Sequence, residues 1–390
     1  MEHPSGADQY RDPAPFRVNA QGLELVFYPG GGDRLAALLA LIDGASHSVR
    51  LAFYIFSPDN AGAQVRDALV AAARRGVDVS VLLDGFGASV DAQYFEALTE
   101  AGGRFACFSA KPGIRYLIRN HQKMVVADDR IAMLGGFNIE DSYFAPPGDD
   151  AWSDLGFTVE GPVVARISDW FGQLEEWTAN PKAQFRSVCR RVRHWQTGSG
   201  PVQLLIGGPT RGLSSWARRI SIDLLNGDRL DLIMAYFSPS RRLSKRIAAI
   251  ARNGRTHLVL AGKTDNPATI GASRSLYRRL IKSGTKIYEF QPCKLHTKLI
   301  VLDDAVYMGS ANFDLRSLYL NLEIVLMVKD AALAEKMRGF IAGHFPASKK
   351  ITPEFYRTNV TRWTRIRWKL SWFLVSAVDY TVTRKLNLGL

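Results

Sequence analysis

Hydrophobic and polar positions follow the same order twice along the chain. An apolar run at 51–59 recurs loosely at 233–240, and each run ends in a polar turn. An Ala-rich segment, a glycine and a β-branched run follow at 68–85 and again at 246–262. Short apolar runs bounded by turns predict strands, and apolar residues at helical spacing predict the helix between them. Each half therefore has a strand–helix–strand rhythm.

A second helix and strand follow in both halves, at 95–108 and at 277–290. Alternation of strands with helices of this length predicts parallel sheets with helices on both faces, one sheet in each half. The segment 178–201 is basic, lacks a clean period and ends in Gly, Ser and Pro, which is typical of a connection. We therefore expect an α/β protein of two α/β/α layered domains, related by a pseudo-two-fold axis and sharing one cleft.

The expected divisions are a flexible N-terminus at 1–20, a first domain at 21–200, a second domain at 201–350 and a basic amphipathic tail at 351–390.

Composition narrows the class of protein without naming a function. The 390 residues are 47% hydrophobic and 22% charged, which excludes a disordered chain. Lys and Arg outnumber Asp and Glu by 50 to 37, so the net charge of +13 favours a phosphate-rich partner, either nucleic acid or an anionic membrane. Cys107, Cys189 and Cys293 are scattered, which argues against a disulfide framework and a structural zinc site. The polar N-terminus predicts no signal peptide, and the apolar stretch 372–378 is too short to span a bilayer, so we expect a cytoplasmic protein.

One polar motif occurs once in each half. Its members are His121, Lys123, Asp128 and Asn138 in the first half, and His296, Lys298, Asp303 and Asn312 in the second. Residues two apart on a strand share a face, so each pair would present an imidazole and an ammonium together. The small residues Gly135, Gly136, Gly309 and Ser310 would let backbone approach a ligand, and an asparagine amide can donate to an oxyanion. The pattern predicts a phosphate site.

Both motifs resemble the HKD motifs of the phospholipase D superfamily, and the resemblance covers residues 20 to 345. The flanks GGFNIEDSYF (135–144), WSDLGFTVEGP (152–162), SANFDLRSLYLNLE (310–323) and AYFSP (235–239) are similar to those of bacterial cardiolipin synthases and related phosphatidyltransferases. The resemblance implies two phospholipase D-like domains with one active-site cleft. It also implies transfer of a phosphatidyl group from phosphatidylglycerol to a lipid hydroxyl through a phosphohistidine, with no cofactor and no metal.

The resemblance implies that His121 is the nucleophile and His296 the general acid and base, although the residues alone leave this order open. Asp154 and Glu323 occupy matching places after each motif and are candidates to orient the imidazoles; buried salt bridges are the alternative. The resemblance further implies that the phosphate oxygens are bound by Lys123, Lys298, Asn138 and Asn312. It also implies that Asp128 and Asp303 stabilise the turn after each motif strand.

The C-terminal segment has the pattern of a helix that lies in a membrane interface. Trp363, Ile366, Leu370 and Phe373 share one helical stripe, with Arg365, Trp368 and Lys369 among the residues beside it. The alternative is a helix docked on the protein's own core.

Three functions are compatible with these residues. The favoured function is phosphatidyl transfer between lipids, with an anionic phospholipid as substrate. The protein would then associate peripherally with the inner face of the cell membrane. Hydrolysis by water, as a phospholipase D or a nuclease, uses the same two histidines, but no nucleic-acid-binding module is evident. A non-catalytic membrane-binding protein has no need of two intact motifs. The sequence does not reveal the acceptor alcohol or the oligomeric state.

Five further residues carry weaker expectations. Tyr54, Phe56, Tyr236 and Phe237 are predicted to be core strand residues, and Asp265 to line the cleft or cap a loop.

Overall fold

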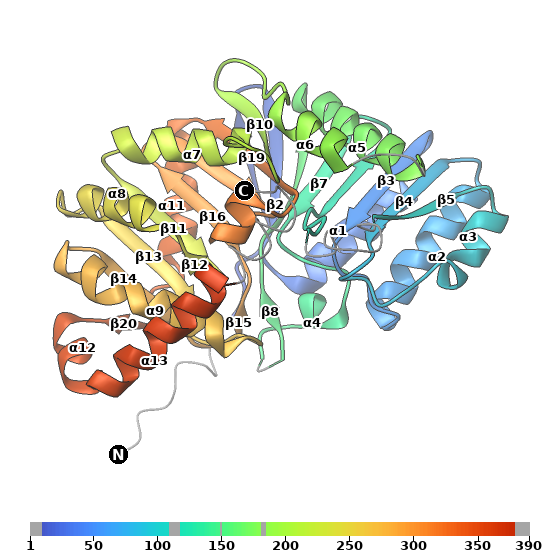
Figure 1. Cartoon of the computed structure of the whole chain (residues 1–390). Coiled ribbons are helices and arrows are strands. Elements are labelled where there is room, and N and C mark those ends of the chain that lie inside the picture. Colours follow the sequence, from blue (N-terminus) through green and yellow to red (C-terminus); the bar gives the residue numbers. More distant parts are fainter. Residues whose placement is uncertain (1–9, 109–117, 149, 181–184, 379–390) are drawn as a thin grey trace.

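The computed structural model describes residues 10–108, 118–148, 150–180 and 185–378. Two eight-stranded sheets lie side by side with helices packed against them (Figure 1). Seven strands follow in the same order in both sheets, β2-β9-β7-β6-β3-β4-β5 in the first and β10-β19-β17-β16-β11-β13-β14 in the second. The eighth strand differs, because β1 extends the first sheet beside β2 and β20 extends the second beside β14. The predicted α/β architecture of two related layered halves is confirmed.

The strands of the first sheet are β1 (Phe16–Ala20), β2 (Leu23–Tyr28), β3 (Ser48–Phe53), β4 (Asp78–Asp84), β5 (Arg104–Phe108), β6 (Met124–Ala127), β7 (Ile131–Gly135) and β9 (Gly156–Glu160). The helices before the second sheet are α1 (Gly31–Asp43), α2 (Asn60–Arg74), the 3-10 turn η2 (Gln93–Phe95), α3 (Glu96–Glu100), α4 (Asp141–Phe144), α5 (Val163–Ala179) and α6 (Phe185–Arg193).

The strands of the second sheet are β10 (Val202–Gly207), β11 (Leu230–Met234), β13 (Thr256–Ala261), β14 (Lys286–Phe290), β16 (Lys298–Leu302), β17 (Ala305–Gly309), β19 (Glu323–Lys329) and β20 (Ser348–Ile351). Its helices are α7 (Ser215–Asn226), α8 (Arg241–Ala251), α9 (Pro267–Lys282), α10 (Leu315–Tyr319), α11 (Ala331–Ala342), α12 (Pro353–Asn359), α13 (Arg362–Trp372) and the π-helical turn η3 (Phe373–Val378). Four short strands form two small ladders, β8 (Trp152–Ser153) with β15 (Lys294–Leu295) and β12 (Phe237–Ser238) with β18 (Phe313–Asp314).

The prediction of parallel sheets is only partly right. The neighbours β3, β4 and β5 pair in parallel, as do β11, β13 and β14, because a helix crosses over between consecutive strands. The strands that follow each HKD motif pair in antiparallel fashion instead, since tight hairpins join β6 to β7 and β16 to β17. Both sheets are therefore mixed.

One expectation about the segments outside the repeats is wrong. Phe16–Ala20 is not flexible, because it forms β1 and pairs with β2 along its whole length. The connection contains a helix, α6, which buries Val188 and Val192 in the core beneath the two sheets. Apolar residues four apart on an otherwise arginine-rich segment are the signal for this helix.

The aspartates of the HKD motifs lie at the hairpin turns. Asp128 has a φ of 54° and accepts hydrogen bonds from the backbone N–H groups of Ser46, His47 and Ser48 at 2.9, 2.7 and 2.8 Å. Asp303 has a φ of 50° and accepts in the same way from Asp228 and Arg229. Each aspartate thus fastens the hairpin to the start of the strand beside it.

We expect Asp128→Gly to lower the free energy of unfolding by about 2 kcal/mol, because three charge-assisted hydrogen bonds are lost while glycine still accepts the positive φ. Asp129→Gly is the matched control, since Asp129 shares the positive φ and its carboxylate makes a surface ion pair with Arg50. Urea denaturation of both variants measures the difference. Equal destabilisation by the two changes would contradict this role of Asp128.

Candidate active site

A cavity of about 530 Å³ lies between the two halves and is lined by residues of both. Both motif histidines and both motif asparagines reach it. The other lining residues are Tyr54, Ile55, Arg119, Tyr143, Trp152, Tyr236, Asp265, Asn266, Thr269, Asp314, Arg316, Ser317, Asn321, Leu374 and Val375. The two motifs, 175 positions apart, therefore meet at one site.

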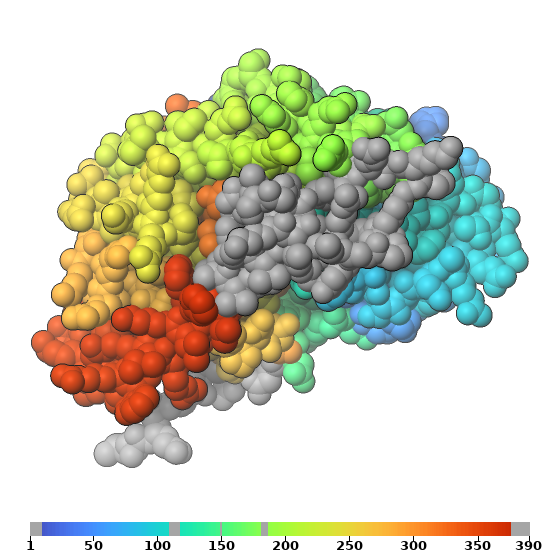
Figure 2. Space-filling model, in the orientation of Figure 1, coloured from blue at the N-terminus to red at the C-terminus, as the bar shows by residue number. Residues whose placement is uncertain are grey.

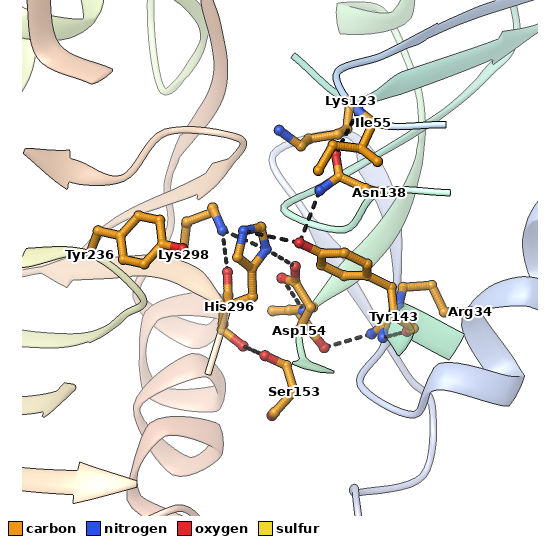
Figure 3. Close-up of polar contacts among 12 residues, drawn as sticks. Arg34, Ile55, Lys123, Asn138, Tyr143, Ser153, Asp154, Tyr236, His296 and Lys298 are labelled. Atoms are coloured by element: carbon orange, nitrogen blue, oxygen red, sulfur yellow. Dashed lines mark hydrogen bonds and ion pairs between the residues drawn. The ribbon is translucent and has the colours of Figure 1, made fainter. Parts of the chain in front are cut away.

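The first half holds the histidine of the second half. His296 donates from Nδ1 to Asp154 Oδ2 at 2.7 Å, and its backbone N–H donates to Ser153 O at 2.8 Å (Figure 3). The parallel pairing of β8 with β15 brings these residues together. The carboxylate leaves Nε2 as the ring nitrogen available for chemistry.

The second half holds the histidine of the first half in the same way. His121 Nδ1 lies 3.0 and 3.1 Å from the two carboxyl oxygens of Glu323, and its backbone N–H donates to Leu322 O at 3.0 Å. Ser310 donates its hydroxyl to the same carboxyl group. The candidate orienting residues Asp154 and Glu323 therefore each contact the histidine of the opposite half.

The lysines are buried behind the histidines and are absent from the residues that line the cavity. Lys123 Nζ donates to His121 O at 2.7 Å, and Lys298 Nζ donates to His296 O and lies 2.8 Å from His296 Nδ1. The expectation that histidine and lysine share a strand face is wrong, because β6 begins only at Met124 and β16 only at Lys298. Each histidine lies in the irregular segment before its strand.

The two motif asparagines have different surroundings. Asn138 accepts from the backbone N–H of Ile55 at 3.2 Å and donates to Tyr143 Oη at 2.9 Å, which in turn lies 3.4 Å from His296 Nε2. Asn312 Oδ1 is buried without a hydrogen-bond partner among the described residues. Asn312 therefore offers an open acceptor to the cavity, whereas both ends of the Asn138 amide are engaged.

The small residues of the motifs make room for the orienting carboxyl groups. A Cβ on Gly136 would lie 2.7 Å from Asp154 Oδ1, and one on Gly309, whose φ is 149°, would lie 2.2 Å from Ile324 O. Gly135 is equally close to Leu155 O, at 2.8 Å. These contacts are with Asp154, with its neighbour Leu155 and with β19, so the glycines have a structural role in the motifs.

Burial and mutual repulsion lower the positive charge that the lysines and histidines of the site carry at pH 7. Burial, together with the charges of Lys123 and Lys298, holds the pKa of His121 well below 6.5, and burial with Lys298 lowers the pKa of His296 to about 4. Burial also lowers the pKa of Lys123 to about 7 and that of Lys298 to about 8. Both imidazoles are therefore neutral at pH 7 before an anion enters.

The two orienting carboxyl groups differ in charge. Burial raises the pKa of Glu323 to about 8, against the opposing charge of Lys123. Burial alone would also raise the pKa of Asp154, but Lys298 and His296 hold it below its ordinary value. His296 thus faces an ionised carboxylate and His121 a largely protonated carboxyl group, so His296 is the better place for a proton.

Sequence reasoning missed several residues around the histidines. Tyr54 and Tyr236 line the cavity, with ring centroids 5.0 Å from His121 and 6.4 Å from His296, so their prediction as core residues is wrong. Phe56 and Phe237 are fully buried, as predicted. Each tyrosine lies just after an apolar strand, Tyr54 directly after β3 and Tyr236 two residues after the end of β11, which was the available signal.

Arg34 on α1 is a positioning residue that no sequence pattern indicates. Its buried guanidinium donates to Asp154 O at 2.6 Å and to Tyr143 O at 2.5 Å (Figure 3). Gly156 leaves space for it, since a Cβ there would lie 2.8 Å from Arg34 Cδ. Arg34 thereby holds together the two segments that contact the His296 ring.

The tail helix α13 docks on α9 and lies at the surface of the molecule, in red in Figure 2. Its apolar stripe is exposed. The ring of Trp368 lies 5.8 Å from the guanidinium of Arg274, and the guanidinium of Arg365 lies 5.9 Å from the Tyr356 ring, so these two half-buried tail residues contact the protein itself. Their predicted binding to membrane stays a prediction. Trp363, Ile366, Leu370 and Phe373 are 75, 54, 56 and 51% exposed, and Lys369 is exposed beside them. Leu374 and Val375, at the end of the stripe, line the cavity.

Removing the charge of Lys298 should raise the pKa of both histidines. We expect Lys298→Met to raise the pKa of His296 and of His121, since a nearby like charge disfavours the imidazolium. NMR titration of isotope-labelled histidines measures this, with Lys245→Met on exposed α8 as the control. Unchanged or lower values in the Lys298 variant would contradict the proposed electrostatics.

Comparison with known sequences places this chain among characterised relatives. Residues 38–174 and 222–343 match the family described as "Cardiolipin synthase, PLD-like domain". Cardiolipin synthase B of Escherichia coli (strain K12) is 30% identical over 355 residues, which cover 88% of this chain and 85% of that protein. The major cardiolipin synthase ClsA of Bacillus subtilis is 29% identical over 354 residues, covering 87% and 72% of the two chains.

Solved structures share the fold at low identity. Phosphatidylserine synthase of Haemophilus influenzae superposes with a TM-score of 0.69 at 16% identity, covering 97% of this chain and 98% of that one. Polyphosphate kinase of Porphyromonas gingivalis has a TM-score of 0.56 at 15% identity, covering 90% of this chain and 53% of that one. Within the described residues, no helix combines the length and apolar character that crossing a bilayer requires.

Proposed function

Since the chain belongs to the phospholipase D-like family of cardiolipin synthases, we propose that it transfers a phosphatidyl group from phosphatidylglycerol to a hydroxyl of a second lipid. The product would be cardiolipin or a related diphosphatidyl lipid. The observation that carries the proposal is the pair of imidazoles on one cavity, each oriented by a carboxyl group of the other half. A phosphodiester exchange needs one nucleophile and one proton carrier, and the site supplies both.

The first step forms a bond from His121 Nε2 to phosphorus and breaks the bond from phosphorus to the headgroup oxygen, which takes a proton from His296. Glycerol leaves. In the second step neutral His296 takes the proton of the incoming hydroxyl, its oxygen bonds to phosphorus, and the phosphorus–nitrogen bond breaks. Asp154, ionised and bonded to His296, favours the proton carrier at that position. His121, with its depressed pKa, suits the nucleophile.

Binding of the substrate phosphate would raise the positive charge on the lysines and imidazoles of the site. The phosphate anion offsets the repulsion among Lys123, Lys298 and the imidazoles, so their pKa values rise when it enters. His296 then accepts the proton it must deliver. The lysines would stabilise the equatorial oxygens, a contact that requires each Nζ to turn from the histidine carbonyl toward the cavity.

Replacing either histidine by glutamine should lower turnover of phosphatidylglycerol by ~10³-fold or more, because neither step has an alternative nucleophile or acid. The two variants differ in what they accumulate. We expect His296→Gln to retain a phosphatidyl adduct, seen by intact-protein mass spectrometry after mixing with lipid, and His121→Gln to show none.

Products are followed by lipid mass spectrometry, with and without a chelator. Cardiolipin with glycerol supports transfer, and phosphatidic acid alone would indicate hydrolysis instead. An adduct in the His121 variant but not in the His296 variant would reverse the two roles. We expect the chelator to have no effect.

We also propose that the exposed stripe of α13 binds the inner face of the cell membrane. Apolar side chains flanked by Arg and Lys suit an interface with anionic headgroups. The stripe ends at Leu374, which lines the cavity, so a membrane bound there would present lipid at the site. This geometry supports a lipid substrate over a nucleic acid.

The double change Ile366→Asp with Leu370→Asp should weaken binding to phosphatidylglycerol vesicles by at least ~10-fold, because two apolar contacts with the interface are lost. Ile222→Asp with Leu225→Asp on α7 is the matched control, since these residues are 50 and 64% exposed. Vesicle co-sedimentation measures binding, and turnover of detergent-dispersed lipid checks the fold. Equal effects of the two pairs would exclude α13 as the contact.

A further inference from the structure

One tyrosine lies beside each histidine in the cavity. Tyr54 follows β3 and Tyr236 follows β11, and their rings face His121 and His296 respectively. Figure 3 places Tyr236 on the side of Lys298 and His296. The two positions are not equivalent in the repeat, because the backbone N–H of Phe313 donates to Tyr236 O whereas that of Ile139 donates to Ile55 O. The groups around the two hydroxyls are not symmetric.

The Tyr54 end of the cavity is cationic. The guanidinium of Arg119 lies 5.8 Å from the centre of the Tyr54 ring. Burial raises the pKa of Tyr54, and the charges of Arg119 and Arg316 oppose that shift, so both guanidiniums act on its hydroxyl. Arg119 comes from the first half and Arg316 from α10 of the second, and both line the cavity.

The Tyr236 end is acidic. Tyr236 donates its hydroxyl to Asp265 Oδ1 at 3.0 Å, and Thr264 donates to the same oxygen at 3.0 Å. Within the described part of the chain, no donor is hydrogen-bonded to Oδ2. Asn266 rather than Asp265 caps α9, accepting from Ala268 N at 3.1 Å. The Asp265 carboxylate lines the cavity. Its Oδ1 is fixed by two hydrogen bonds, and its Oδ2 can accept a hydrogen bond from a ligand.

A second open acceptor lies at the same end. Asn312 is 3% exposed, and its Oδ1 has no partner in the described ranges. Its neighbour Phe313 donates a backbone hydrogen bond to Tyr236 O at 3.1 Å, which places Asn312 next to Tyr236. A buried acceptor without a donor costs free energy unless a ligand supplies one. Hydroxyl groups are the donors that match both acceptors, whereas an anion would be repelled by Asp265.

We propose that the Tyr236 end binds the alcohol of the reaction and that Asp265 selects polyol headgroups by accepting a hydrogen bond from the hydroxyl next to the reacting one. This inference rests on the proposed function and names the alcohol class for the same site. In a double displacement through one histidine, the leaving and the entering oxygen both lie opposite the nucleophile, beside the proton carrier. His296 faces the Tyr236 end, so glycerol departs there and the glycerol group of the second lipid enters there.

The test compares two soluble acceptors that differ by one hydroxyl. The full chain acts on phosphatidylglycerol vesicles with equal amounts of 1,2-propanediol and 1-propanol, and mass spectrometry measures both phosphatidyl alcohols. We expect the diol product to dominate for the unmodified protein. Asp265→Asn should lower the diol-to-propanol ratio by ~10-fold or more, because only the diol loses a hydrogen bond to a charged acceptor.

Tyr236→Phe provides a second variant, since it removes the donor that orients the carboxylate and should lower the ratio in the same direction. Asp43→Asn, at an exposed position of α1, is the matched control and should keep the original ratio. An unchanged ratio in Asp265→Asn, equal use of the two alcohols by the unmodified protein, or equal loss of both products would overturn the assignment. If the unmodified protein does not turn over phosphatidylglycerol at all, the proposed function itself fails, and the assignment fails with it.

Discussion

The active site depends on a reciprocal clamp in which each half of the molecule holds the other half's histidine. Two hydrogen bonds make each clamp, one from the backbone N–H of the histidine and one from its Nδ1. The carbonyl and the carboxyl group that accept them come from adjacent residues, Ser153 with Asp154 and Leu322 with Glu323. Neither half can orient its own imidazole, so catalysis requires both halves in place.

Shifted pKa values explain how the site accommodates four buried basic side chains. Two lysines and two imidazoles lie away from water, and burying unpaired charge is costly. Depressed pKa values of the histidines and lysines, and a Glu323 that is largely protonated, reduce that cost. An entering phosphate supplies the missing negative charge. The electrostatics are thus arranged for the complex with substrate rather than for the free protein.

The repeated motifs and their matching flanks predicted the duplicated fold and both histidines, because these features are local in sequence. The crossing of the carboxyl groups was not predictable, since Asp154 and Glu323 occupy equivalent places and sequence spacing does not say which imidazole each contacts. Arg34 was also hidden, because it acts on backbone carbonyls that no residue pattern marks. The alternation of helices and strands led to the prediction of parallel sheets. The tight hairpins at Asp128 and Asp303 make the strands after each motif antiparallel instead.

The central claim is that the two imidazoles act on opposite sides of one phosphorus atom. A crystal structure with bound orthovanadate, which adopts the geometry of the phosphoryl transition state, measures this most directly. The account predicts vanadium bonded to His121 Nε2, with the opposite apical oxygen hydrogen-bonded to His296 Nε2. Vanadate within reach of one imidazole only, with the other turned away from it, would contradict the account.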